Sequence, residues 1–307
     1  MIGLAQAGWA AADPISLPYL MQKEFDGRDL KPIKVLDNNS AYTKYYITYK
    51  SGQLTISGIM DVPKGKGPFP VVITAHGFIR PEYYVTGRGL KREQDYLARH
   101  GYVVLHPDYR NHAGSSKDPD NDLKLHIGYI EDVINAVYAI KNSTLSYLDK
   151  ENIGMLGHSL GGGLALGIMV TKPDLIKAYV LFAPMSSDYR DNFNRWILRR
   201  REPKYGNRAT AQKIIEKYGS PEANPEFWDN LSPQTFLDRV RSPVIVHHGT
   251  ADDSVPLEWS EKLVKAFEGH GKDIKLYIYE GERHEFIKQW PLVMKRTVEF
   301  FDPLLKT

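Results

Sequence analysis

One serine in the sequence lies in a pattern that suits nucleophilic chemistry. Ser159 is at the centre of the run Gly-His-Ser-Leu-Gly at 157–161, after an apolar segment at 152–157 and before a helical pattern at 160–171. A G-x-S-x-G pattern at a strand-to-helix junction predicts a nucleophile elbow, in which glycines let neighbouring backbone approach closely. Because such short runs recur by chance in glycine-rich loops, the prediction depends on whether the chain also supplies catalytic partners.

The partners of a nucleophilic serine are a base, an acid that orients the base, and donors for the oxyanion. After an elbow of this kind the acid and then the histidine are expected, each following a strand. Asp252 follows an apolar strand predicted at 243–247, and His284 follows the next predicted strand at 275–279. Asp253 is the immediate neighbour of Asp252, and spacing does not exclude it. The sequence therefore predicts a triad with His284 as the base.

The oxyanion donors are predicted from two backbone N–H groups. One belongs to Leu160, directly after the serine, and the other to the loop after the first parallel strand. That loop reads His76-Gly77-Phe78, which makes the N–H of Phe78 the second candidate donor. Gly77 allows the backbone to close in, and His76 is predicted to tie the loop down as a buried structural side chain.

The elements that must position these residues alternate along most of the chain. Residues 1–40 lack periodicity and predict an irregular N-terminal extension, and 42–50 with 54–62 predict an antiparallel hairpin. From residue 71 onward apolar strands alternate with helices, which indicates a mostly parallel sheet with helices on both faces. We expect an α/β fold with about eight strands, formed by residues 41–307 as one domain.

One segment at about 185–235 interrupts this alternation. It carries helical patterns near 188–201, 210–218 and 224–231. Structureless loops of this length are rare in compact domains, so we expect a helical cap. The cap should lie over the C-terminal edge of the sheet, where open α/β sheets bind their ligands.

Five segments together carry the motifs of one enzyme family. They are 76–77 (HG), 157–162 (GHSLGG), 231–233 (LSP), 248–256 (HGTADDSVP) and 281–286 (GERHEF). With these motifs the chain resembles the α/β-hydrolase superfamily and, within it, the catalytic domain of the prolyl-oligopeptidase-like branch, family S9. The similarity extends over about residues 42–301, and in the family's H-G-x-x-D-x-x-V-P pattern the aspartate corresponds to Asp252.

The resemblance implies an α/β-hydrolase fold and a serine hydrolase that needs no metal or organic cofactor. About 40 residues precede the hairpin, too few for the β-propeller that gates the family's peptidases, and the insert is larger than a minimal connection. We therefore expect a carboxylesterase that acts on aromatic (feruloyl or cinnamoyl) or short-chain acyl esters. An S9-like serine peptidase or amidase is the first alternative, and a non-catalytic small-molecule binding protein is the second.

The amino-acid composition limits the kinds of molecule that the protein is expected to bind. The 307 residues include 40 basic and 37 acidic side chains, a balance that argues against nucleic acid. Cysteine is absent, and no apolar run approaches the roughly 20 residues that span a bilayer. The expected partner is a small-molecule or polymer-linked ester, and the expected location is cytoplasmic or, after loss of a signal peptide, secreted. His247 and His248 point to opposite faces of a strand, so a metal pair is not expected.

Aromatic residues and one arginine complete the candidate site. Arg110, in a D-x-R-x-x-x-G-S loop, is predicted to pair with an acid that fixes the loop, and Asp132 is the candidate. Candidate substrate-pocket residues are those beside the serine, after the predicted oxyanion loop, or on the insert. They are Tyr83, Tyr84, His158, Trp196 and Trp228.

Overall fold

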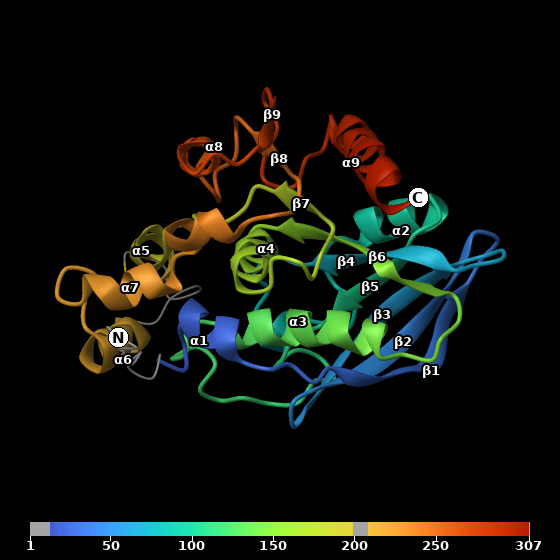
Figure 1. The fold of residues 1–307 in the computed structure, drawn as a ribbon, viewed down its shortest axis with the longest axis horizontal. Coiled ribbons are helices and arrows are strands. Elements are labelled where there is room, and N and C mark those ends of the chain that lie inside the picture. Colours follow the sequence, from blue (N-terminus) through green and yellow to red (C-terminus); the bar gives the residue numbers. More distant parts are fainter. Residues whose placement is uncertain (1–12, 199–207, 307) are drawn as a thin grey trace, which may run out of the picture.

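The protein is built on one nine-stranded sheet, shown in Figure 1. The computed structural model describes residues 13–198 and 208–306. The strand order across the sheet is β1-β2-β3-β5-β4-β6-β7-β8-β9. In this order the pairs β1–β2, β2–β3 and β3–β5 are antiparallel, and every pair from β5–β4 to β8–β9 is parallel. The strands are β1 (Arg28–Asn38), β2 (Tyr42–Ser51), β3 (Leu54–Pro63), β4 (Phe69–Ala75), β5 (Val103–Pro107), β6 (Leu148–His158), β7 (Ala178–Phe182), β8 (Val244–Gly249) and β9 (Lys275–Tyr279). This architecture confirms the predicted mostly parallel α/β sheet.

Helices cover both faces of the sheet because its central strands are apolar on both sides. Val71 and Ile73 of β4 pack into one core cluster, whereas Val72 between them packs into the other. Helices α1, α3, α4 and α8 contribute to the first cluster, and α2 and α9 to the second (Figure 1). Their bounds are α1 (Leu17–Gln22), α2 (Lys91–Arg99), α3 (Ile127–Lys141), α4 (Leu160–Thr171), α8 (Leu257–Gly269) and α9 (Trp290–Leu305). Among the described helices none is long and apolar enough to cross a membrane.

The N-terminal segment corrects the prediction of an irregular extension over 1–40. Within its described part, from residue 13, it forms helix α1 and strand β1. Strand β1 pairs antiparallel with β2 through three register shifts and is an edge of the sheet. Most of its side chains are exposed, and Pro32 interrupts it, as is common on edge strands. An exposed edge strand has no apolar alternation, so the pattern that identifies buried strands is missing.

The insert between β7 and β8 is helical, as expected. Its described elements are α5 (Tyr189–Asn192), a π-helical turn (Phe193–Leu198), α6 (Arg208–Tyr218), α7 (Pro225–Leu231) and the 3-10 segment η3 (Pro233–Arg239). Figure 1 shows α5, α6 and α7 gathered at one end of the molecule, away from the β1–β3 strands. Part of the helix predicted at 188–201 lies outside the described residues. Trp228 is fully buried at the centre of the insert, with its ring centroid 4.5 Å from that of Phe193.

Candidate active site

Ser159 lies at the sharp turn between β6 and α4. Its backbone has φ 56° and ψ −116°, a strained conformation for a residue with a side chain. The turn is held by hydrogen bonds: the Ser159 N–H donates to Phe182 O at 2.9 Å, and the Gly163 and Met185 N–H groups both donate to Ser159 O at 3.1 Å. The serine therefore has the strand–turn–helix context that the motif predicts.

The glycines of the elbow are required by close packing of the backbone. A Cβ atom at Gly157 would lie 2.4 Å from the carbonyl oxygen of Gly161, and one at Gly161 would lie 2.0 Å from that of Ala75. At Gly162 it would lie 2.7 Å from Cβ of Pro184. At these glycines the end of β4 and the residues before the insert pack directly against the elbow, and this packing fixes the position of the serine.

Asp252 and His284 meet in the loops after β8 and β9. Nδ1 of His284 lies 2.7 Å from Oδ2 of Asp252. The other oxygen, Oδ1, accepts hydrogen bonds from the N–H groups of Ser254 (2.8 Å) and Val255 (2.9 Å). Asp253, by contrast, is exposed and pairs with Arg283. The geometry thus selects Asp252 rather than Asp253 as the partner of the histidine.

Hydrogen bonds keep the buried carboxylate of Asp252 ionised. Burial by itself raises its pKa, but hydrogen bonds from His248 and His284 and the charge of His284 outweigh burial, so the pKa lies well below its usual range. An ionised Asp252 carboxylate beside Nδ1 of His284 accepts a hydrogen bond and so favours the tautomer with the proton on that nitrogen. The remaining nitrogen, Nε2, is then free to accept a proton.

His158 joins the elbow to the histidine loop. Its Nε2 lies 3.1 Å from the carbonyl oxygen of His284, and the two ring centroids are 4.4 Å apart. Burial, together with the charge of His284, lowers the pKa of His158 to about 4. The ring is therefore neutral at neutral pH and donates from Nε2, because a carbonyl oxygen only accepts. His158, the residue before Ser159, therefore ties the loop of His284 to the elbow.

The loop of the second candidate oxyanion donor lies against the elbow. A Cβ atom at Gly77 would lie 3.2 Å from Cβ of Ser159, which places the backbone beside Phe78 next to the nucleophile. Hydrogen bonds from the loop after β5 also hold this segment: Tyr109 donates to His76 O at 3.2 Å, and Nε2 of His112 lies 2.9 Å from the carbonyl oxygen of residue 79. These bonds fix the backbone that carries the proposed donor.

His76 has the buried environment expected of a structural side chain. Its ring stacks between Tyr84 and Tyr109, with centroids 4.8 and 4.2 Å away. Burial and the nearby rings of His106 and His112 lower its pKa well below the usual range. A neutral ring at this position supports the oxyanion loop without adding charge to it.

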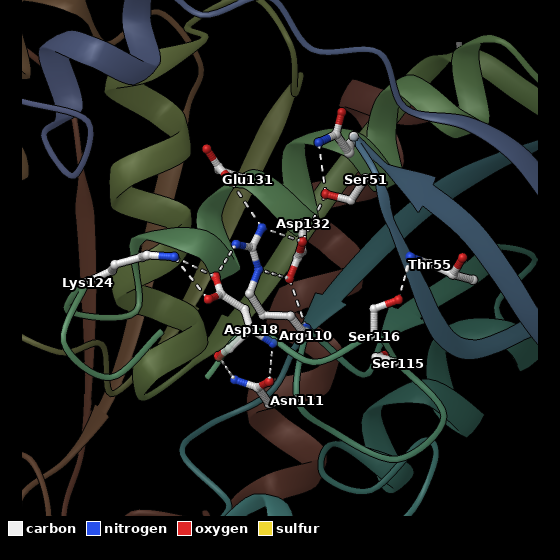
Figure 2. Close-up of polar contacts among 12 residues, drawn as sticks. Ser51, Thr55, Arg110, Asn111, Ser115, Ser116, Asp118, Lys124, Glu131 and Asp132 are labelled. Carbon is white, nitrogen blue, oxygen red and sulfur yellow. Dashed lines mark hydrogen bonds and ion pairs between the residues drawn. The ribbon is translucent and has the colours of Figure 1, made fainter. Parts of the chain in front are cut away.

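Arg110 is paired as predicted. Its Nε and Nη2 donate to the two carboxylate oxygens of Asp132 at 3.0 and 2.9 Å, and it also bonds Glu131 (3.0 Å) and Asp118 (3.1 Å). Figure 2 shows these carboxylates around the guanidinium, with Ser51 also bonded to Asp132. The loop after β5 is thereby tied to α3 and to β2. Four of the five guanidinium N–H groups donate to carboxylates of the protein and the side chain is buried, so Arg110 is not placed to bind a substrate carboxylate.

The comparisons with known proteins identify the family of the chain. The model of the prolyl oligopeptidase family, peptidase S9, matches residues 89–307, more than half of the chain. The chain belongs to the prolyl oligopeptidase family. This membership confirms the predicted S9 resemblance.

Relatives of this S9 chain include both peptidases and esterases. Dipeptidyl aminopeptidase BIII of Pseudoxanthomonas mexicana is 24% identical over 292 residues, which are 91% of this chain and 39% of that protein. The chain thus spans about two fifths of the length of this relative. Acetyl xylan esterase 1 from Thermoanaerobacterium sp. has a TM-score of 0.63 at 19% identity, covering 90% of this chain and 87% of that one. Est1E of Butyrivibrio proteoclasticus, solved with ferulic acid, has a TM-score of 0.64 at 20% identity, covering 85% and 99%. These two likenesses show the α/β-hydrolase fold.

The aromatic residues predicted to form a pocket have different surroundings. Tyr83 is exposed, whereas Tyr84 is buried and donates to Asp108 Oδ1 at 2.8 Å. Trp228 donates to Gly219 O at 3.2 Å within the insert core. Because both side chains are buried and hydrogen-bonded, Tyr84 and Trp228 offer no surface to a ligand.

Two contacts in the site were not predicted from the sequence. Nε2 of His248 lies 3.3 Å from Oδ2 of Asp252, and Nδ1 of His248 lies 2.7 Å from Ser260 Oγ. Arg195 of the insert donates from Nε to Ser254 O at 3.0 Å and from Nη2 to Asp253 O at 3.3 Å. The sequence signal for His248 is its place in the H-G-x-x-D motif, whereas nothing in the pattern distinguishes Arg195 from other basic residues of the insert.

Proposed function

We propose that this S9 serine hydrolase is a carboxylesterase that works through a triad of Ser159, His284 and Asp252. The observation that carries the proposal is the 2.7 Å contact between His284 Nδ1 and Asp252 Oδ2, in loops beside a serine on a strained elbow. A carboxylate, an imidazole and a hydroxyl in this order are what acyl transfer without a cofactor requires.

The proposed reaction has two halves with the same proton carrier. Ser159 Oγ attacks the ester carbonyl carbon while its proton moves to Nε2 of His284, and the N–H groups of Phe78 and Leu160 receive the oxyanion. The intermediate collapses as His284 protonates the leaving alcohol, which produces an acyl-enzyme. Water then attacks this ester by the same route, releasing the acid and restoring the serine. A strong oxyanion donor contributes about 3–4 kcal/mol to such a step.

Two structural neighbours support an ester substrate. They are acetyl xylan esterase 1, matched over 87% of its chain, and Est1E, solved with ferulic acid and matched over 99% of its chain.

The test is the hydrolysis of p-nitrophenyl acetate by Ser159→Ala. We expect kcat to fall by at least about four orders of magnitude, since the remaining groups cannot form an acyl-enzyme. Ser40→Ala, an exposed serine between β1 and β2, is the matched control and should keep wild-type turnover. Substantial turnover by the Ser159 variant would refute the assignment of the nucleophile.

A serine peptidase or amidase is the second candidate, favoured by the family and by the name of the dipeptidyl aminopeptidase relative. Amide hydrolysis needs stronger protonation of the leaving amine by His284. Comparing aminoacyl p-nitroanilides with p-nitrophenyl esters separates the two candidates, and a higher kcat/KM for the anilides would favour the peptidase. Failure of a fluorophosphonate probe to label Ser159 would instead indicate a non-catalytic binding protein.

A further inference from the structure

A small apolar cavity lies beside the candidate nucleophile. Its volume is about 40 Å³. Leu160 in its wall directly follows Ser159, and Met185 in its wall donates its N–H to the Ser159 carbonyl oxygen at 3.1 Å. Other wall residues come from α4, from the approach to α3 and from the insert. They include Gly163, Leu164, Leu125 and Tyr189.

The cavity lies close to both proposed oxyanion donors. Leu160, one of them, forms part of its wall. His126 also lines the cavity, and its ring centroid lies 6.2 Å from that of Phe78, the other proposed donor, which is not itself part of the wall. A substrate whose carbonyl oxygen is held by these two backbone N–H groups would direct one of its substituents into the cavity.

Each polar side chain on the cavity wall has a hydrogen-bond partner within the protein. Nε2 of His126 lies 3.1 Å from Asp122 and Ser186 donates to Asp191 at 2.8 Å, and neither aspartate lines the cavity. The Tyr189 hydroxyl donates to Leu125 O at 2.8 Å, and the Asn192 side chain is bonded twice to the backbone of Ser186, at 3.1 and 2.8 Å. Among the described residues that line the cavity there is no carboxylate. The wall therefore suits an uncharged hydrocarbon group and gives an α-amino cation no partner, because burying an unpaired charge is costly.

The volume limits the length of the group that fits. An apolar cavity of about 150 Å³ holds a benzene molecule, so a cavity of about 40 Å³ has room for a group of a few carbon atoms and not for a phenyl ring. We propose that the cavity is the acyl pocket and that the enzyme acts on esters of short, uncharged acyl groups, from acetyl to butyryl. This proposal rests on the proposed esterase function. It selects the short-chain class over the feruloyl and cinnamoyl class, whose phenyl ring exceeds the cavity.

Gly163 and Met185 make the pocket size adjustable by mutation. A Cβ atom at Gly163 would lie 3.2 Å from Met185 Cβ and 4.0 Å from its Sδ, so Gly163→Ala narrows the cavity. Met185→Ala removes the facing thioether and widens it. The two variants test the pocket in opposite directions, and each remains informative if the other does not fold. Gly269→Ala is the control, because its Cβ would meet no atom within 4 Å.

The experiment measures kcat/KM for p-nitrophenyl acetate, butyrate and octanoate and for methyl ferulate. A methylene that a pocket cannot hold is worth about tenfold or more, so the wild type should prefer butyrate to octanoate by at least about tenfold. Gly163→Ala should lower the butyrate-to-acetate ratio by about tenfold, and Met185→Ala should raise the octanoate-to-butyrate ratio. Gly269→Ala should leave both ratios unchanged.

Different outcomes test the acyl-pocket proposal and the esterase proposal separately. Equal turnover of all chain lengths, or preference for methyl ferulate, would overturn the acyl pocket while the esterase function stands. The acyl pocket would also be overturned if the ratios of kcat/KM between chain lengths stayed unchanged in both Gly163→Ala and Met185→Ala. No turnover of any ester, with no fluorophosphonate labelling of Ser159, would overturn the esterase function and the pocket together.

Discussion

Asp61 of β3 is a buried carboxyl whose charge state should control the stability of the fold. The side chain is fully buried, and Nζ of Lys44 lies 3.6 Å from its Oδ2. Neither carboxylate oxygen has a hydrogen-bond partner in the part of the chain that the structure describes. Burial raises the pKa of Asp61 to about 7, and Lys44 only partly offsets this effect. The ionised form is therefore costly in the folded state.

The sign of the effect follows from proton linkage. A carboxyl with a raised pKa keeps its proton in the folded state after the unfolded chain has released it, so the free energy of unfolding falls as pH rises from about 4 to about 7. Each pKa unit corresponds to about 1.36 kcal/mol. The full difference from the ordinary value of 3.8 is worth about 4 kcal/mol, and the part between pH 5 and pH 8 about 3 kcal/mol.

Asp61→Asn keeps the shape of the side chain and removes its ionisation. Relative to the wild type, the variant should therefore gain about 3 kcal/mol of unfolding free energy between pH 5 and pH 8. Guanidinium chloride unfolding at the two pH values measures this gain. Asp238→Asn, at an exposed aspartate of η3, is the control and should show no such change. If Asp61→Asn and the wild type lose stability equally over this range, the buried carboxyl does not titrate as argued.

Two further predictions concern the acid of the proposed triad and the buried arginine. Asp252→Asn should lower kcat by about four orders of magnitude, the loss expected of a Ser-His-Asp triad, because Nδ1 of His284 loses its carboxylate. Ester turnover by Asp253→Asn is the comparison, and an equal loss there would contradict the choice of Asp252 as the acid. Arg110→Gln should lower the free energy of unfolding by about 3–5 kcal/mol, because it leaves buried carboxylates without their cation. Arg241→Gln, which breaks an exposed pair with Asp174, should cost at most about 1 kcal/mol by the same denaturant measurement.

The sequence predicts the parallel part of the fold well because that part is buried on both faces. Helices α4 and α8 begin and end where the pattern places them, at 160–171 and 257–269, and β9 matches at 275–279. Asp252 and His284 are found together because each follows its strand by a short loop, and loops after neighbouring parallel strands emerge at the same edge. The order of elements thus predicts proximity without any contact being known.

What the sequence misses depends on side-chain direction and exposure. Strand β1 has no apolar alternation, because it is exposed at the sheet edge. Tyr84 and Trp228 are aromatic residues in the expected segments, yet packing turns both inward, and residue type does not reveal which way a loop or helix faces. The apolar wall beside Ser159 is assembled from α1, α3, α4 and the insert, so no single segment carries its pattern.

The contact of Arg195 with the loop of Asp252 has an optical consequence. Its guanidinium lies 5.2 Å from the ring centroid of Trp196 and 5.9 Å from that of Trp259, while its donors hold the carbonyl oxygens of Asp253 and Ser254. A change in the position of the insert that breaks these bonds would also move the guanidinium away from the two indoles. We expect such a change to alter tryptophan emission, so fluorescence offers a measurement of the contact between the insert and the loop of Asp252.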